Sequence, residues 1–282
     1  MTSDNLYRFL FQDKHVRGEL VQLSSSLDNM LLNHDYPFPV KKLLAELVAA
    51  TSLLTATLKL EGEIAVQIQG DGPLRFAAVN GNNQQEFRGI ARMRSELQGD
   101  TFRELVGDGH MLVTITPKQG ERYQGIIPLT GESLAQTLES YFAQSEQLPT
   151  RLYLFTEIQP QHSRASGFML QVLPVNQQQA KIDFAELAIL SDTLTADETL
   201  NLPVEQLLYR LYHEENIELF TPQTVSFVCG CSREKSEAAI ISLGKSIINE
   251  HIAEGKLEIS CDYCQNNYVF DRNDLQIISD KL

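Results

Sequence analysis

The residues of this chain that could do chemistry are its four cysteines, which fall into two tight pairs. Cys229 and Cys231 form a Cys-x-Cys motif, and Cys261 and Cys264 form a Cys-x-x-Cys motif further along the chain. Two pairs of thiols spaced in this way are typical of a four-cysteine metal site, in which each pair supplies two sulfurs to one tetrahedral ion. Zinc is the default occupant because it prefers thiolate ligands and a closed tetrahedral shell. Gly230 suits the tight backbone between the first two sulfurs.

Four interpretations of these cysteines compete. Inert core cysteines would rarely fall into two close pairs by chance, and permanent disulfides would require an oxidising compartment. A purely structural zinc site stays open, and so does a redox switch, because zinc holds sulfur as thiolate, the form that oxidants attack. Oxidation would then make two short disulfides and release the metal. It would also remove the folding free energy that the metal supplies, of order 10 kcal/mol in zinc-dependent modules.

Length and composition predict an ordinary globular protein of more than one domain. The chain has 282 residues, of which 43% are hydrophobic and 21% charged, and this length favours two domains or a domain plus a small module. The N-terminus has no basic segment followed by an apolar run, and no apolar stretch approaches the length that crosses a bilayer. We therefore expect a cytoplasmic protein without a membrane partner.

The distribution of charge argues against nucleic acid as a partner. The net charge is -14, and the part of the chain from residue 179 onward has eight basic and eighteen acidic residues. A zinc ion with four thiolates would add two more negative charges to this part. Zinc modules that bind nucleic acid normally use a basic surface against the phosphates. The electrostatic potential of this acidic part would instead repel phosphates.

The first 176 residues indicate an α+β domain of mixed sheet and helices. A long, largely buried helix is expected at residues 40–60, a short one ending at residue 32, and an amphipathic one at residues 133–144. Period-two alternation and flanking turn residues predict strands. The predicted strands are residues 7–11, 16–23, 64–69, 74–79, 87–93, 111–116, 123–129, 152–155 and 168–173.

Residues 177–226 are predicted to be a helical linker. Its clearest helix spans residues 200–213 and has an apolar face made of Val204, Leu207, Leu208 and Leu211. Helices this short are marginal without tertiary contacts, so their stability must come from docking onto another surface. The linker is therefore expected to be conditionally ordered.

Residues 227–282 are predicted to be a small zinc-binding module. A helix is expected at residues 233–249, interrupted by Gly244, and a hairpin around residues 257–270 would present the second cysteine pair. A module of this size should bury little core, so zinc is expected to supply a large part of its folding free energy.

No enzyme is predicted from the remaining residues. His15, His34, His110 and His162 lie far apart in sequence, and no nucleophile elbow or H-E-x-x-H motif accompanies them. The turn at residues 107–109 has no following Gly-Lys-Ser/Thr, so it predicts no nucleotide site.

Taken together, several segments resemble one known family. The combination of C-G-C-S-R-E at residues 229–234 with C-D-Y-C-x3-Y-x-F at residues 261–270 resembles the bacterial redox-regulated holdase chaperones of the heat-shock protein thirty-three family. The resemblance extends over the whole chain. It includes Q-G-D-G-P-L at residues 69–74, G-E-R-Y-Q-G at 120–125, Y-F-x2-S-E-Q-L-P-T at 141–150 and L-Y-H-E-E at 211–215.

The resemblance implies a chaperone of the oxidative stress response that is switched by its cysteines. In the reduced state one zinc ion would be bound by Cys229, Cys231, Cys261 and Cys264, and the protein would be inactive. Hypochlorous acid, or peroxide with heat, would produce Cys229–Cys231 and Cys261–Cys264 disulfides and release the zinc. The module and the linker would then unfold, and a homodimer would bind unfolding client proteins without ATP. The linker's apolar face, Val204, Leu207, Leu208 and Leu211, would be presented to these clients.

Two other functions remain as alternatives. A zinc-ribbon regulatory protein would bind RNA or DNA in a salt-dependent way, which the acidic C-terminal part disfavours. A thiol-disulfide oxidoreductase would use Cys261 and Cys264 at a strand-to-helix junction with one low-pKa thiol, whereas the sequence around them predicts a hairpin.

Overall fold

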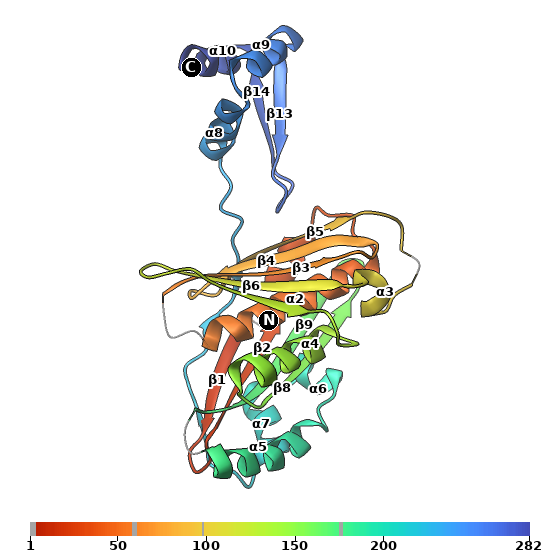
Figure 1. The fold of residues 1–282 in the computed structure, drawn as a ribbon, viewed down its shortest axis with the longest axis vertical. Coiled ribbons are helices and arrows are strands. Elements are labelled where there is room, and N and C mark those ends of the chain that lie inside the picture. Colours follow the sequence, from red (N-terminus) through yellow and green to blue (C-terminus); the bar gives the residue numbers. More distant parts are fainter. Residues whose placement is uncertain (1–3, 58–60, 98, 175–176) are drawn as a thin grey trace. The chain divides into compact units, whose positions relative to one another are not determined.

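The computed structural model describes residues 4–57, 61–97, 99–174 and 177–282, which form two compact units (Figure 1). The first unit runs to Phe227 except for Leu32–His34, and the second comprises Val228–Leu282 with Leu32–His34. The predicted separation of residues 177–226 as a linker stays a prediction, and these helices pack within the first unit. Among the described residues, every helix is too short or too polar to cross a membrane.

One sheet of the first unit is antiparallel and is built around the N-terminal hairpin. Its strands in spatial order are β10 (Ile217–Leu219), β1 (Asn5–Phe11), β2 (Val16–Leu23), β9 (Ser163–Val172) and β8 (Thr150–Ile158). A further short strand, β11 (Gln223–Thr224), also pairs with β1. The predicted hairpin arms at residues 7–11 and 16–23 are confirmed.

The second sheet of this unit is also mainly antiparallel. Its strands in spatial order are β12 (Ser226–Phe227), β5 (Glu86–Met93), β4 (Leu74–Asn82), β3 (Gly62–Gly70), β6 (Gly109–Pro117) and β7 (Tyr123–Pro128). Only β12 runs parallel to its neighbour, β5. The alternation of Ile64, Val66 and Ile68 with more exposed residues confirms the predicted period-two strand.

Helix α2 (Phe38–Thr57) lies between the two sheets and contacts strands of both (Figure 1). Pro39 is tolerated in its first turn, because amide groups there have no partner within the helix. Ala45, Ala49 and Ala50 are fully buried and let the sheets approach the helix closely. The prediction of a long buried helix is confirmed to residue 57, and predicted residues 58–60 lie outside the described part. Smaller helices of this unit are α1 (Ser25–Leu31), α3 (Phe102–Val106), α4 (Leu134–Tyr141) and the π-helix η1 (Phe142–Glu146).

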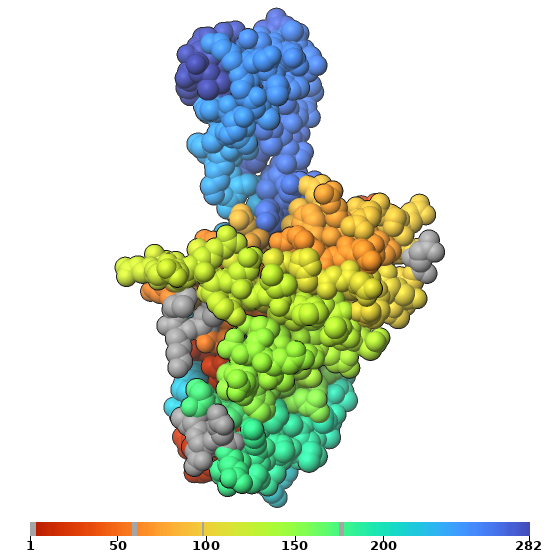
Figure 2. Space-filling view, viewed as in Figure 1, coloured from red at the N-terminus to blue at the C-terminus, as the bar shows by residue number. Residues whose placement is uncertain are grey.

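Three helices cover the other face of the first sheet: α5 (Gln177–Ser191), α6 (Ala196–Asn201) and α7 (Val204–Tyr212). Figure 2 shows their green-to-cyan surface continuous with that of the preceding elements. Beneath them lies a second hydrophobic core, in which Leu187, Leu207 and Tyr212 pack against Phe9, Phe11, Leu20 and Phe168 of the strands. The rings of Phe11 and Tyr212 meet edge to face with centroids 5.0 Å apart. Docking of these helices therefore buries their apolar faces, as the sequence predicted.

Polar contacts add to this docking. The amide of Gln22 on β2 donates to the carbonyl oxygens of Thr199 and Leu202 at 2.7 and 3.0 Å. The Tyr153 hydroxyl donates to Asp192 at 2.5 Å. Each contact satisfies a polar group at the edge of the apolar interface, which keeps the net cost of burying it low.

The second unit consists of α8 (Arg233–Leu243), α9 (Lys245–Glu254), the hairpin β13 (Lys256–Ser260) and β14 (Asn267–Asp271), and α10 (Arg272–Asp280). The predicted helix at 233–249 is two helices, because Gly244 has φ 86° and ends the first. The expectation of little core needs refinement. Ile240, Ile248, Phe270, Leu275 and Ile278 form a small buried cluster, two members of which come from the unpredicted α10.

A buried carboxyl in β2 makes the stability of the first unit depend on pH. Glu19 is fully enclosed, its Oε2 has no hydrogen-bond partner among the described residues, and its Oε1 lies 3.9 Å from Nε of Arg17. Burial raises the pKa of Glu19 to about 7, although Arg17 and Arg8 oppose the shift. The folded state thus binds a proton that the unfolded state releases near pH 4.5, so stability falls as pH rises from about 4.5 to 7.

Glu19→Gln is therefore expected to raise the free energy of unfolding at pH 8, by up to about 3 kcal/mol, and to change it little at pH 4.5. Urea unfolding of the full chain at several pH values measures this difference. Glu63→Gln, on an exposed position of β3, is the matched control. Equal effects of both substitutions at pH 8 would contradict the assignment.

Candidate metal centre

The first cysteine pair lies on the short connection that leads into α8. Gly230 separates the two sulfurs with φ 67°, a left-handed conformation that favours glycine. Ser232 follows as the N-cap of α8, and its hydroxyl accepts a hydrogen bond from the amide of Lys235 at 3.3 Å. The Lys235 ammonium also donates to the Gly230 carbonyl. The helix start thus fixes the backbone that carries Cys229 and Cys231.

The second pair lies at the turn of the β13–β14 hairpin, as predicted. The amide of Cys261 donates to the carbonyl of Asn266 at 2.8 Å, and the amide of Gln265 donates to the carbonyl of Cys261 at 2.8 Å. Gln265 has φ 59°, which turns the chain back after Cys264. This tight loop points both sulfurs the same way.

The structure brings the four sulfurs together. All four Sγ atoms lie within 4.8 Å of one another. Cys229 Sγ is 3.4 Å from Cys261 Sγ, and Cys231 Sγ is 3.5 Å from Cys264 Sγ. A tetrahedral ion with metal–sulfur distances of about 2.3 Å would need sulfurs about 3.8 Å apart. The four residues therefore fit a closed four-thiolate metal site.

The electrostatics of the cluster also suit a cation. Burial raises the pKa of Cys229 and the pKa of Cys264. For Cys231 burial acts in the same direction, but hydrogen bonds from Tyr268 and the neighbouring thiols outweigh it and lower its pKa to about 7. Near neutral pH, one thiolate is thus readily available, and a divalent cation would favour ionisation of the others. Cys264 is buried and the other three cysteines are half-buried, so small molecules can reach the site.

Two residues around the sulfurs were not singled out from the sequence. The Tyr268 hydroxyl on β14 donates to Cys231 Sγ at 3.1 Å, which stabilises a thiolate there. Arg233, at the start of α8, donates to the Val269 carbonyl at 2.7 Å and to Asp274 at 2.6 Å. Its guanidinium also stacks 4.3 Å above the centre of the Phe270 ring. Both residues belong to the segments that carry the family resemblance, residues 229–234 and 261–270, but no spacing or periodicity assigned either of them a role at the site.

Arg233→Ala is expected to weaken metal retention, because the first pair loses its side-chain anchor to β14 and α10. The ion pair is partly exposed, so the expected loss of unfolding free energy is modest, about 1–2 kcal/mol. Arg233→Lys should recover only part of it, since lysine cannot make the two-sided contact. Competition with a chromophoric zinc chelator measures the change, with Lys245→Ala on α9 as the control. Unchanged retention in Arg233→Ala would contradict an anchoring role.

The residues predicted to meet clients are buried in this structure. Val204, Leu207, Leu208 and Leu211 have 2, 1, 5 and 9% of their surface exposed and all belong to the core beneath α5–α7. They lie on one face of α7, as predicted. This surface can meet another protein only if α7 leaves the sheet, so their role in client binding stays a prediction.

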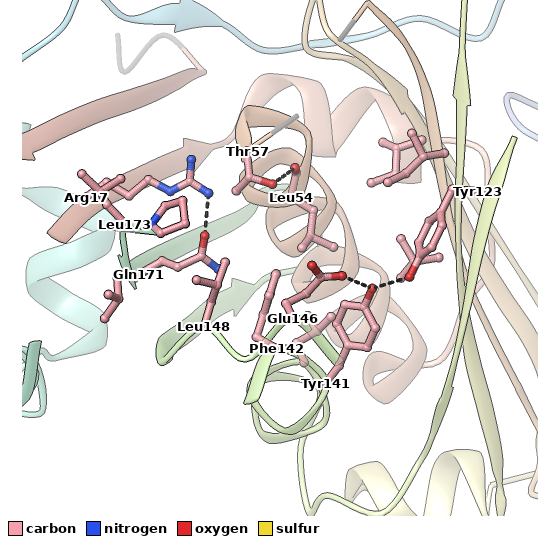
Figure 3. A pocket seen from close by; sticks show the side chains of 16 residues that line it. Arg17, Leu54, Thr57, Tyr123, Tyr141, Phe142, Glu146, Leu148, Gln171 and Leu173 are labelled. Carbon is pink, nitrogen blue, oxygen red and sulfur yellow. Dashed lines mark hydrogen bonds between the residues drawn. The ribbon is translucent and has the colours of Figure 1, made fainter. Parts of the chain in front are cut away.

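A pocket of about 330 Å³ opens in the first unit near the end of α2 (Figure 3). Its walls are mainly apolar. At one end Arg17 donates to the buried Gln171 side chain at 2.5 Å, and at the other Tyr141 donates to Glu146 at 3.0 Å. Burial and hydrogen bonds with Tyr123 and Glu146 raise the pKa of Tyr141, so this phenol stays protonated at neutral pH. Cysteine, serine and histidine are absent from the described residues that line the pocket.

Comparison with known proteins shows which family this chain resembles over nearly its whole length. A family model described as Hsp33 protein matches residues 4–271. A 33 kDa chaperonin from Pseudoalteromonas translucida is 50% identical over 279 residues, covering 99% of each chain. Proteins of the same name from Photobacterium profundum and Salmonella typhimurium are 50% and 49% identical, covering 98% and 96% of this chain and 94% of each relative.

A solved structure shares the fold. The crystal structure of a 33 kDa chaperonin, a heat shock protein 33 homologue from Thermotoga maritima, superposes with a TM-score of 0.85 at 21% identity. The match covers 99% of this chain and 98% of that one. The predicted α+β fold with four clustered cysteines near its C-terminal end is thus confirmed.

Proposed function

This chain belongs to the Hsp33 family of chaperones, and we propose that it is a redox-regulated, ATP-independent holdase of the cytoplasm. Its clients are unfolding proteins, which it keeps from aggregating under oxidative stress. The observation that carries this proposal is the meeting of two cysteine pairs, distant in sequence, within 4.8 Å. Free thiols in such a cluster suit a reducing compartment, where oxidation is a signal.

In the resting state the four cysteines hold one zinc ion. Bound zinc would keep all four sulfurs as thiolates and tie the two motifs together, supplying a folding free energy of order 10 kcal/mol. The small core of the second unit has only five buried apolar side chains besides Cys264, so the module depends on this tie. The Tyr268 hydroxyl donates to the Cys231 sulfur, and Arg233 ties the start of α8 to β14 beside the site.

On oxidation, Cys229 joins Cys231 and Cys261 joins Cys264. Each disulfide forms from two thiolates that give up two electrons. Two equivalents of hypochlorous acid, each of which takes up one proton and the two electrons to give chloride and water, balance the reaction. Both disulfides close very short loops, and neither replaces the link between the motifs. With no thiolate left to bind it, the metal leaves and the module loses most of its stability.

Unfolding then spreads into the linker. Residues 217–227 pair with the sheets of the first unit through short strands of three, two and two residues, and this segment leads directly into Cys229. Once they detach, α5–α7 lose their anchor on the C-terminal side and expose Val204, Leu207, Leu208 and Leu211 to clients. The acidic C-terminal part, with ten of the fourteen net negative charges, helps keep the unfolded segment soluble. Homodimerisation of the active form would bring two such surfaces together.

The test follows zinc and client aggregation in parallel. Zinc release is read with a chromophoric chelator, and light scattering of a heat-unfolding client is recorded before and after oxidant treatment at elevated temperature. Zinc release with suppressed scattering, both reversed by reductant plus zinc, is the expected result. Zinc release without any protection would leave only a structural zinc site and overturn the proposal.

A further inference from the structure

Two long strands of the first unit are covered at their outer edges only by short pieces of residues 216–227. Strand β1 has seven residues, but its outer neighbours β10 and β11 have three and two. Strand β5 has eight residues, and its outer neighbour β12 has two. An uncovered edge of this kind presents a row of unpaired amides and carbonyls that can bind another extended chain.

The covering segment is bound through its backbone. The amide of Phe220 donates to the carbonyl of Arg8, and the amide of Gln12 donates to the carbonyl of Asn216, both at 2.9 Å. Further along, the amide of Val225 donates to the carbonyl of Asp4 at 2.9 Å. Pairing with β1 is antiparallel throughout. These contacts need an extended chain but no particular side chain.

Side chains of the segment add an alternating pattern. Ile217 and Leu219 pack on the core beneath α5–α7, whereas Glu218 and Phe220 between and after them are exposed. Val225 is 3% exposed and fills the core around α2. The edge of β1 therefore selects an extended segment with apolar residues at every second position, a pattern that unfolding proteins expose often.

We infer that the outer edge of β1, once residues 216–227 have left it, binds an extended client segment as an added antiparallel strand. Apolar side chains of the client take the places of Ile217 and Leu219. This inference rests on the proposed function, because the edge opens only when the linker detaches. Recognition through the backbone accounts for binding of clients without common sequence, and returning the linker to β1 would displace the client.

The probe is a fluorescent peptide with the sequence of residues 216–227, added to the oxidised full-length protein. We expect it to bind the oxidised but not the reduced protein, to slow amide hydrogen exchange at residues 8–12, and to displace a heat-unfolded client. N-methylation at the Phe220 position removes one donor to β1 and should weaken binding about fivefold. N-methylation at Leu219, whose amide points away from β1 by strand alternation, is the matched control and should change it less than twofold.

The outcomes separate this inference from the proposed function. Equal affinity of the two methylated peptides, or protection of residues 8–12 without displacement of the client, overturns strand addition and leaves the holdase intact. Failure of the oxidised protein to suppress client aggregation overturns the proposed function, and the inference falls with it.

Discussion

Replacing Cys264 with serine is expected to abolish tight zinc binding and unfold the second unit, while helix α2 and the long strands of the first unit stay folded. If four ligands share about 10–16 kcal/mol of binding and folding free energy, losing one removes about 3 kcal/mol, a factor of more than a hundred in affinity. Cys264 is the most buried of the four, so the serine hydroxyl would also replace a buried sulfur. Zinc content by atomic absorption and hydrogen exchange in β13 and β14 measure the two effects.

Asn266→Ser serves as the control, because Asn266 is an exposed residue of the same hairpin turn. Its backbone carbonyl, which accepts from the Cys261 amide, is kept by the substitution. One tightly bound zinc in the Cys264→Ser protein, at the affinity of the unaltered chain, would contradict a site made of four thiolates.

Leu187→Ala is expected to make the reduced, zinc-loaded protein partly active. Leu187 on α5 is fully buried in the core between the linker helices and the sheet, so the substitution should destabilise docking by about 2–5 kcal/mol. It leaves the predicted client-binding side chains of α7 unchanged. Faster hydrogen exchange in α5–α7, together with suppressed client aggregation under reducing conditions, is the expected result.

Ile189→Ala provides the comparison on the same helix, since Ile189 is 69% exposed. It should leave both exchange and activity as they are. Faster exchange in α5–α7 without any activity would show that release of the linker helices is not what switches the chaperone on.

Local features of the fold were predicted well because they depend on short-range pattern. Cysteine spacing located all four residues of the cluster, and period-two alternation located β3 and the hairpin around Cys261. The long helix was marked by a continuous apolar run. Even the break at Gly244 was expected, although its positive φ divides the segment into two helices rather than bending one.

Features that depend on contacts between residues far apart in sequence could not be predicted from local sequence patterns. Strand β10 has three residues, too few for any periodicity, and β12 lies in a segment that the sequence predicts as extended, but their pairing with β1 and β5, far away in sequence, had no local signal. Helix α10 was missed although Asp271 and Asp274 form a capping box at its start. Arg233 acquires its role only when the fold brings Phe270 and Asp274 beside it.

Two close sulfur contacts in the cluster join one motif to the other, Cys229 to Cys261 and Cys231 to Cys264. Cys229 and Cys261 are 32 positions apart in sequence, yet their sulfurs lie 3.4 Å from each other. A disulfide between them would restrict the unfolded chain by about 4 kcal/mol through loop closure, more than twice the value for Cys229–Cys231. It would therefore stabilise the folded module, whereas disulfides within the motifs leave the module free to unfold.

Under the proposed redox switch, the same oxidant would therefore open the module or lock it, and the first disulfide formed would decide which of the two happens. The outcome would depend on the relative rates of the two reactions, because each oxidised sulfur can be attacked by a thiolate of its own motif or by one of the other motif. Disulfides within the motifs would give the open, active module. A disulfide between the motifs would give a closed, inactive module that could be activated only after a reductant had broken the bond.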